Sequence, residues 1–263
     1  MFFRNVFGFS AVGLLLAASS VAQAANLVMN GSFESFTNSV NPGIPSQLGN
    51  SGTSGYTRLT DWDVGPGNTG HYGFLFAPGQ ADTTGALSPR FSNTFRLWGP
   101  GTGSANGLTA SSPVGGNYLA LDGDSNLRGT GVSQTISGLT AGQTYGLSFY
   151  WAAAQQHRFD GDTTEQVQVM LGAQTYLTSI FNLPNHGFSG WMQQTFNYTA
   201  TSGTAALNFL AIGTPNGLPP FVLLDGVSLD VAVPEPSSVA LAGLGIIGFG
   251  VQILRRRMKR MAV

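Results

Sequence analysis

The sequence predicts an all-β protein, an antiparallel β-sandwich, and three observations lead to this fold class. Between residues 26 and 232, apolar side chains often recur at every second position, and helical periodicity is scarce. Clusters of Gly, Asn, Thr and Pro separate these stretches, as the turns of a sandwich require. Strands do not alternate with long helical patterns, which disfavours an α/β fold.

The clearest predicted strand is at residues 144–151. It places Tyr145, Leu147, Phe149 and Trp151 on one face, because successive side chains of a strand point to opposite sides. Further strands are predicted at residues 118–121, 166–171, 195–199, 207–211 and 227–231. These segments define a sandwich between residues 25 and 232.

Residues 37–116 have a looser pattern and are rich in Gly, Asn, Ser and Thr. They also carry many aromatic residues, which disordered segments lack. We therefore expect a long, loop-rich insertion that is ordered and lies on the sandwich, with Trp62 and Trp151 in the core. Further on, Ala141 and Gly142 predict a hairpin-type turn between two strands.

The composition excludes several function classes. Charged residues make up 9% of the chain, and there is no Cys, so disulfides and Cys-based zinc or redox sites are excluded. Residues 25–233 carry five Arg and eleven acidic residues, a net charge of −6. Such a body would repel phosphate, so nucleic acid is not an expected partner.

Residues 1–24 have the pattern of a secretory signal peptide. Arg4 supplies the positive charge, 6–18 form a short apolar region, and Ala22-Gln23-Ala24 is a small-x-small cleavage site. The mature chain is thus predicted to begin near Ala25, after export through the secretion machinery.

The C-terminal region predicts a second membrane signal. Residues 239–254 are apolar except for Gln252, and as a helix they would span about 24 Å at ~1.5 Å per residue. The basic residues that follow would stay in the cytoplasm and leave residues 25–238 outside. This basic cluster consists of Arg255, Arg256, Arg257, Lys259 and Arg260. Before the span, the stiff segment Pro234-Glu235-Pro236 suits a recognition or processing site.

Pro-Glu-Pro, a Gly-rich span and a basic cluster, in this order over residues 233–260, resemble the PEP-CTERM sorting signal of Gram-negative bacteria. The resemblance implies an exosortase as partner. It also implies an intermediate that is anchored in the inner membrane by the C-terminal helix and faces the periplasm. The final location would be the cell surface or the extracellular matrix of a biofilm.

Residues 26–34, 132–149 and 221–229 together resemble the galactose-binding-like jelly roll, a fold shared by many carbohydrate-binding modules. In that fold, the opening Glu and the closing Asp often share a structural Ca²⁺, and Glu34 and Asp225 match these positions. Gly226 stands where a second acid often follows the closing Asp. The resemblance therefore implies a structural calcium site, and the alternative is that Glu34 and Asp225 are surface or capping carboxylates. No organic cofactor is expected.

No catalytic motif is found. The sequence lacks G-x-S-x-G and H-E-x-x-H. The acidic loops 122–126 and 160–165 fail the EF-hand pattern, and we expect solvated turns there. A pair of carboxylates for glycoside hydrolysis, with Asp160 and Asp162 as candidates, stays open because only spatial separation defines it. We expect a protein with no catalytic residues.

Aromatic and polar loop residues fit sugar binding best, because aromatic rings stack on sugars and a few polar groups set the orientation. The candidates are Trp98, Gln156, His157 and Arg158. The sequence thus predicts an exported surface or matrix protein that binds polysaccharide without catalysis. Two alternatives stay open: a structural matrix or surface-layer protein without a sugar site, and a polysaccharide-active enzyme.

Overall fold

The computed structural model describes residues 26–41, 43–49, 54–65, 72–124 and 130–232. The predicted signal peptide (1–24) and the sorting segment (233–260), with its apolar span and basic cluster, lie outside the described residues. Within the described part, no helix is long and apolar enough to cross a membrane. The regular elements found there are β-strands and one 3-10 helix, η1 (Pro100–Thr102).

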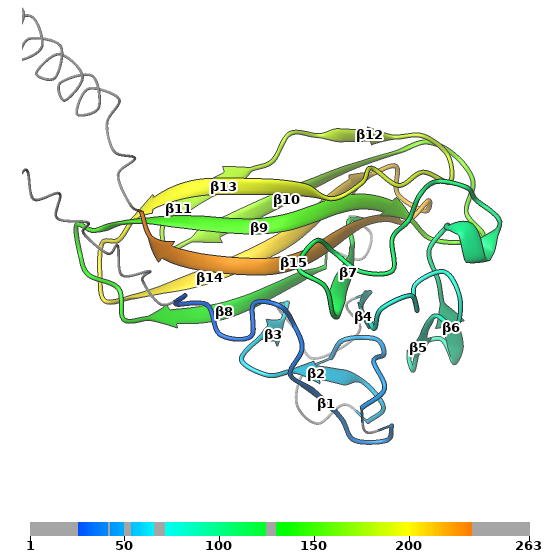
Figure 1. Ribbon diagram of the computed structural model, residues 1–263, viewed down its shortest axis with the longest axis horizontal. Helices are drawn as coiled ribbons and strands as arrows, with labels where there is room; N and C mark the ends of the chain where they lie inside the picture. The colour runs from blue at the N-terminus through cyan, green and yellow to red at the C-terminus, as the bar shows by residue number, and fades with distance from the viewer. Residues whose placement is uncertain (1–25, 42, 50–53, 66–71, 125–129, 233–263) are drawn as a thin grey trace, which may run out of the picture.

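Two antiparallel sheets form a sandwich, which confirms the fold class predicted from the sequence (Figure 1). In the first sheet the order is β11-β10-β14-β8-β3, and β12 pairs with the beginning of β10. The bounds are β3 (Asp63–Val64), β8 (Gly131–Ser137), β10 (Thr163–Leu171), β11 (Gln174–Leu177), β12 (Phe181–Leu183) and β14 (Thr204–Thr214).

The second sheet has the order β13-β9-β15-β7-β4. Its bounds are β4 (Gly73–Phe76), β7 (Tyr118–Asp122), β9 (Thr144–Gln155), β13 (Met192–Thr199) and β15 (Pro220–Val231). Connections repeatedly cross from one sheet to the other, for example from β13 to β14 and from β14 to β15. The expected hairpin at Ala141 and Gly142 is therefore wrong: this turn joins β8 in the first sheet to β9 in the second.

The main core lies between the sheets and follows the alternation seen in the sequence. Tyr145, Leu147, Phe149 and Trp151 are all buried and face this core, as predicted. Trp62 is also buried there, and its indole N–H donates to the backbone carbonyls at positions 29 and 30. The alternation is sufficient to specify this face because period-2 geometry is a local property of the strand.

A second apolar cluster packs on the outer face of the second sheet. Here β9 changes from alternating burial to five consecutive buried residues, 151–155, because both faces of the strand are covered. Phe74 of β4 stacks on Phe95, with ring centroids 4.0 Å apart.

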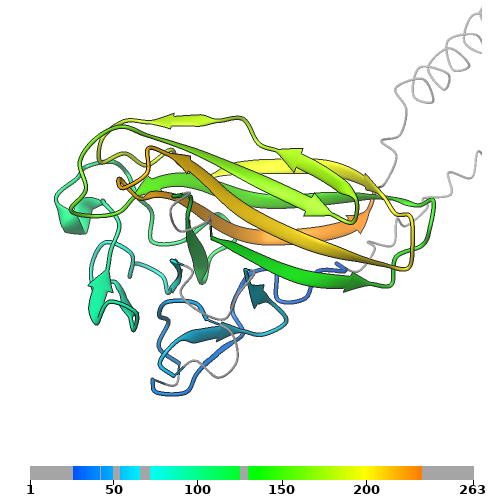
Figure 2. The same ribbon diagram turned by 180° about the vertical axis from the view of Figure 1, so that it is seen from behind.

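The segments that cover this face come from residues 36–116. The same region holds two small two-stranded sheets, which Figures 1 and 2 show gathered to one side of the long strands. One of them contributes Ala86 and Phe95 to this cluster, whereas Leu59 of the other belongs to the main core. Their strands are β1 (Phe36–Asn38), β2 (Thr57–Leu59), β5 (Ala86–Ser88) and β6 (Asn93–Phe95).

The beginning of the described chain lies along its last strand. Leu27 N–H donates to the Leu229 carbonyl, and Val227 N–H donates to the Gly31 carbonyl. Between Asp225 and Ser228 the pairing of β15 with β9 shifts register. This arrangement brings residues 26–34 close to residues 225–229.

Candidate functional site

A cavity of about 640 Å³ opens at one end of the second sheet. Tyr72 precedes β4, Asp122 ends β7, Gln156 follows β9 and Pro219 precedes β15, so antiparallel pairing brings four strand ends to the same edge. The opposite wall comes from the β5–β6 turn, β6 and the residues after it. These wall residues are Phe91, Asn93, Thr94 and Arg96.

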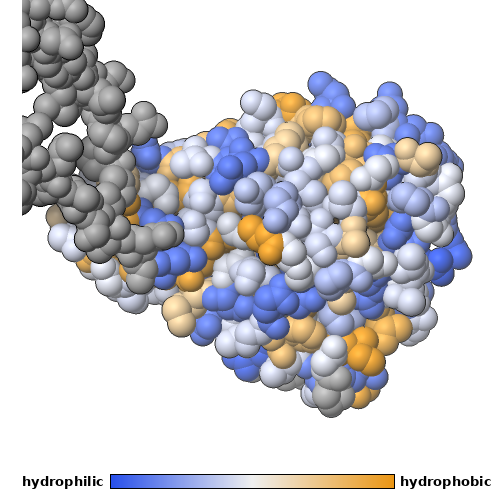
Figure 3. All heavy atoms as spheres, viewed as in Figure 1, coloured by the Kyte–Doolittle hydropathy of each residue, from blue (hydrophilic) through white to orange (hydrophobic). Residues whose placement is uncertain are grey.

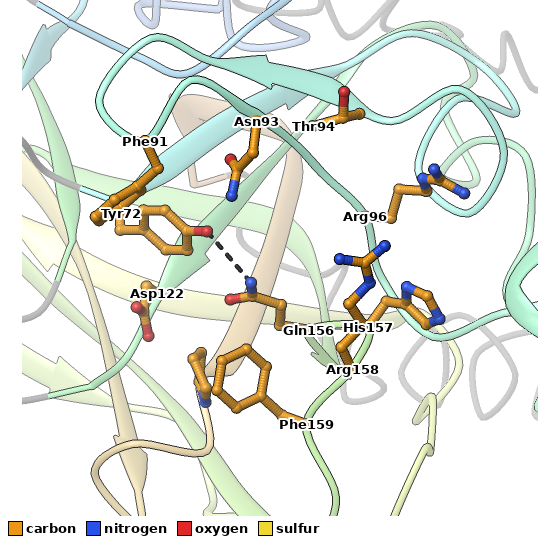
Figure 4. Close-up of a pocket in the computed structure, with 11 residues that line it drawn as sticks. Tyr72, Phe91, Asn93, Thr94, Arg96, Asp122, Gln156, His157, Arg158 and Phe159 are labelled. Carbon is orange, nitrogen blue, oxygen red and sulfur yellow. Dashed lines mark hydrogen bonds between the residues drawn. The ribbon is translucent and has the colours of Figure 1, made fainter.

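Hydrogen-bonding groups gather on one side of the cavity, as Figure 4 shows. The Gln156 amide donates to the Tyr72 hydroxyl across 3.3 Å. Asp122 is fully buried, and its Oδ1 accepts the Asp124 backbone N–H at 2.9 Å. Neither Asp122 Oδ2 nor Gln156 Oε1 has a hydrogen-bond partner among the described residues. Such buried acceptors are costly unless a ligand or water donates to them.

Burial sets the protonation of this side. It raises the pKa of Tyr72 to about 12, so the hydroxyl keeps its proton at neutral pH. It also raises the pKa of Asp122 to about 7, against the weaker opposing effect of the Asp124 hydrogen bond. Near neutrality the Asp122 carboxyl is therefore present in both its protonated and its ionised form.

The other side of the cavity is basic. Figure 4 shows Arg96, His157 and Arg158 together there. Burial, followed by the charges of Arg158 and Arg96, lowers the pKa of His157, so its ring is neutral at pH 7. Arg158 has a left-handed backbone, with φ of 79°, a strained conformation for a non-glycine residue. This conformation belongs to the sharp turn that follows β9.

Aromatic rings complete the lining. Phe91 is 50% exposed, and its ring meets that of Tyr72 edge-on, with centroids 5.4 Å apart. Phe159 lines the cavity from the turn after β9. The exposed Phe91 ring at the mouth, the buried Tyr72 ring behind it and the partly buried Phe159 ring supply the flat apolar surface that a sugar ring requires.

The structure brings three of the four predicted binding residues into this cavity: Gln156, His157 and Arg158. Trp98 is not a lining residue. Its ring stacks on His186, with centroids 3.7 Å apart, and its indole N–H donates to the Phe159 carbonyl at 2.9 Å. Trp98 thus holds the turn that carries the lining residues.

The expectation of solvated acidic turns is wrong at three positions. Asp122 and Glu165 are fully buried, and Asp124 is 5% exposed. In the sequence these acids stand beside Gly, Ser and Thr, a pattern typical of turns, and nothing local shows that other chain segments cover them. Asp122 is therefore a lining residue that sequence reasoning missed, together with Tyr72.

Asp160 and Asp162, the candidates for a hydrolytic pair, have other contacts. Asp160 pairs with His186, and Asp162 accepts the Asn185 backbone N–H at 2.8 Å. Asp122 is the one carboxylate among the described residues that line the cavity. A hydrolytic mechanism with two carboxylates across the scissile bond has no second member there.

The predicted calcium ligands are close enough to influence each other. Asp225 is fully buried, and this burial is the main reason why its pKa is raised to about 7. The negative charge of Glu34 raises the pKa slightly further, whereas hydrogen bonds from the Ser112 hydroxyl and the Gly226 N–H lower it. Glu34 Oε1 accepts the Asn117 N–H at 2.7 Å. Two adjacent carboxylates fit the oxygen ligands that Ca²⁺ prefers.

Few side chains are available as calcium ligands beside Glu34 and Asp225. Among the described residues, no group of three or more His, Cys, Asp or Glu side chains could hold a metal ion. Backbone carbonyls would complete the shell around the two carboxylates, as calcium sites commonly allow. Calcium binding at Glu34 and Asp225 thus stays a prediction.

Comparison with known proteins identifies the C-terminal segment. Residues 232–257 match the PEP-CTERM protein-sorting motif, which confirms the sequence prediction of this signal. The motif indicates export and exosortase-mediated sorting to the cell envelope. No curated protein matches the chain.

Several solved structures of carbohydrate-binding modules resemble the chain distantly. TmCBM61 in complex with β-1,4-galactotriose has a TM-score of 0.35 and 11% identity, over 80% of this chain and 100% of that one. The CBM22-1 xylan-binding domain of Paenibacillus barcinonensis Xyn10C has a TM-score of 0.36 and 10% identity, over 81% and 98%.

Proposed function

We propose that this chain is an exported envelope or matrix protein that binds polysaccharide without catalysis at the cavity beside β4, β7, β9 and β15. The observation that carries the proposal is the lining of that cavity. It combines aromatic rings with buried hydrogen-bond acceptors on a sheet edge, and none of the described residues donates to these acceptors. We also assign the sandwich to the galactose-binding-like jelly rolls, because its strands cross repeatedly between two antiparallel sheets.

The lining matches the two kinds of surface of a sugar ring. Phe91 and Phe159 offer rings for the apolar C–H face, while Asp122 Oδ2 and Gln156 Oε1 accept hydrogen bonds from hydroxyl groups. The volume of about 640 Å³ lies within the usual range of ligand pockets, ~300–1,000 Å³. An isolated hydrocarbon would leave the buried acceptors without partners, and this favours a polyhydroxylated ligand.

Binding of the full chain, purified in mild detergent, to immobilised neutral and acidic polysaccharides tests the proposal. We expect saturable binding to a few polymers with no release of reducing ends or unsaturated products. A folded protein that binds no polymer would favour a structural matrix role instead. Product release would favour the polysaccharide-active enzyme.

We further propose the route by which the protein reaches its location. The signal peptide would direct export, the C-terminal helix would hold an inner-membrane intermediate facing the periplasm, and an exosortase would process the tail. Intact mass of the protein recovered from the cell surface tests this route. We expect loss of the C-terminal tail, and replacement of Pro234, Glu235 and Pro236 by Ala should retain it. A surface protein of unprocessed mass would contradict exosortase sorting.

A further inference from the structure

Three of the four Arg side chains that the structure describes lie at or beside the cavity. Residues 25–233 contain five Arg and no Lys, against eleven acidic residues. Of the four Arg that the structure describes, Arg96 and Arg158 line the cavity. A third, Arg90, lies 5.2 Å from the centre of the Phe91 ring and lowers the pKa of Tyr72 through its charge. The cavity wall is thus positive in a body of net negative charge.

The guanidinium groups of Arg96 and Arg158 have no counter-ion within the part of the chain that the structure describes. Among the described residues, neither Arg96 nor Arg158 makes a salt bridge or a side-chain hydrogen bond. Their combined field reaches His157, whose pKa both of them lower. Two Arg side chains on the same side of the cavity, without a counter-ion among the described residues, create a local positive potential that attracts an anionic group.

The opposite side of the cavity requires hydrogen-bond donors. Asp122 Oδ2 and Gln156 Oε1 are buried acceptors without partners among the described residues. A fitting ligand therefore carries a negative group at one end, hydroxyl donors at the other and an apolar face between them. A sugar ring with a carboxylate has all three features, and its planar carboxylate suits the fork of donors on a guanidinium.

We propose that the cavity selects acidic sugars, with Arg96 and Arg158 binding the carboxylate of a uronic acid unit and Asp122 and Gln156 accepting from its hydroxyl groups. This inference rests on the proposed polysaccharide-binding function and specifies its ligand class. The raised pKa of Asp122 is compatible with it, because partial protonation weakens repulsion between this carboxyl and an acidic ligand.

A matched pair of polymers tests the carboxylate directly. Polygalacturonate and its fully methyl-esterified form share one backbone and differ in the negative charge. The full chain is measured against both in immobilised form at about 0.15 M salt, where exposed charges more than ~8 Å apart are largely screened. We expect binding to the acidic polymer to be at least about tenfold tighter, as the loss of a charge-assisted hydrogen bond predicts.

Variants locate the binding group. Arg96→Gln and Arg158→Gln should each weaken binding to polygalacturonate about tenfold or more. Arg58→Gln is the matched control, because Arg58 lies on β2 and does not line the cavity. An equal loss in all three variants would show non-specific attraction and overturn the proposal. Melting curves of each variant establish that it is folded.

The outcomes separate this inference from the function on which it rests. Equal binding of the acidic and esterified polymers would overturn selection for acidic sugars and leave polysaccharide binding intact. Binding to a sulfated polymer but not to polygalacturonate would overturn the carboxylate assignment. A folded protein that binds neither these polymers nor neutral ones would overturn the proposed function itself.

Discussion

At the scale of single residues, buried carboxyl groups couple the stability of this protein to pH. Glu165 on β10 is fully buried, and its Oε2 has no hydrogen-bond partner among the described residues. Burial raises its pKa to about 8, although the Thr163 hydroxyl donates to Oε1 and opposes the change. The folded state therefore holds a proton that the unfolded chain releases at lower pH.

Protonation of Glu165 should make the free energy of unfolding depend on pH. The stabilising contribution of protonated Glu165 is complete below pH ~4.5 and is lost as the pH rises to about 8. Because a tenfold difference in proton affinity corresponds to about 1.4 kcal/mol, the loss should reach a few kcal/mol. Glu165→Gln should remove this part of the pH dependence of the unfolding free energy, measured by urea denaturation from pH 5 to 9. An unchanged slope in the variant would contradict the prediction.

Trp98 illustrates a residue that acts on the site through its neighbours. Trp98→Phe keeps a ring against His186 but deletes the donor to the Phe159 carbonyl. We expect sugar affinity to fall about fivefold, corresponding to ~1 kcal/mol for one hydrogen bond, with little change in melting temperature. Isothermal titration with the best glycan measures this loss.

Trp191→Phe is the matched control, because the Trp191 indole donates to the Thr109 hydroxyl and this side chain does not line the cavity. If both variants bound glycan as the unmodified protein does, Trp98 would have no part in holding the turn.

At the scale of elements, the second aromatic cluster positions one wall of the site. β6 is three residues long, and within the described ranges it pairs with β5 alone. Phe95 holds β6 in place because its ring packs on the rings of Phe74 and Phe221, with centroid distances of 4.0 Å and 4.7 Å. Asn93, Thr94 and Arg96 enter the cavity from this short strand, so packing under β6 controls where they lie.

Removing that anchor gives an element-level prediction. Phe95→Ala should destabilise the protein by roughly 3–5 kcal/mol, as large-to-small core changes do, and should also weaken glycan binding. Phe209→Ala in the main core, where Phe209 packs on Phe149 at 5.1 Å, should have a comparable cost in stability. Under conditions where both variants remain folded, binding should be reduced in Phe95→Ala alone. Equal glycan binding by the two variants would show that the aromatic cluster under β6 does not position the binding residues.

At the scale of the whole molecule, the first and the last segments of the sandwich lie side by side, and they carry Glu34 and Asp225. Glu34 also lies against Gly116, where an added Cβ would overlap its carboxylate. Gly116 has a φ of 68°, which an L side chain rarely adopts. Three distant segments of the chain thus converge on these two carboxylates.

Calcium should stabilise this junction if it binds there. We expect millimolar CaCl₂ to raise the melting temperature by several degrees over EDTA, because a ligand at 100 times its Kd adds ~2.7 kcal/mol and each kcal/mol shifts the midpoint by ~2–4 °C. Glu34→Gln should abolish this difference. Identical melting curves with CaCl₂ and with EDTA would leave Glu34 and Asp225 as hydrogen-bond acceptors only.

The distribution of hydrophobic residues over the surface is also a property of the whole molecule. On the face shown in Figure 3, hydrophobic residues lie in small groups among hydrophilic and neutral ones. Large exposed apolar patches commonly mark docking sites, and this face has none that the figure shows.

Local patterns in the sequence predicted several of the strands, the sandwich class and the sorting motif. The side chains of residues 144–151 alternate because neighbouring residues of a strand point to opposite faces, and this depends only on the chain itself. The PEP-CTERM motif is likewise read from contiguous residues. Gln156, His157 and Arg158 could be selected because they directly follow such a strand.

Only the tertiary structure decided which segments meet and which charges are buried. Tyr72 and Gln156 are 84 positions apart and become neighbours because β4, β7, β15 and β9 pair in that order. Asp122 and Glu165 stand among turn-forming residues, yet distant strands remove them from water. Burial and strand pairing depend on contacts between residues that are far apart in the sequence, so a local pattern of residues cannot predict them.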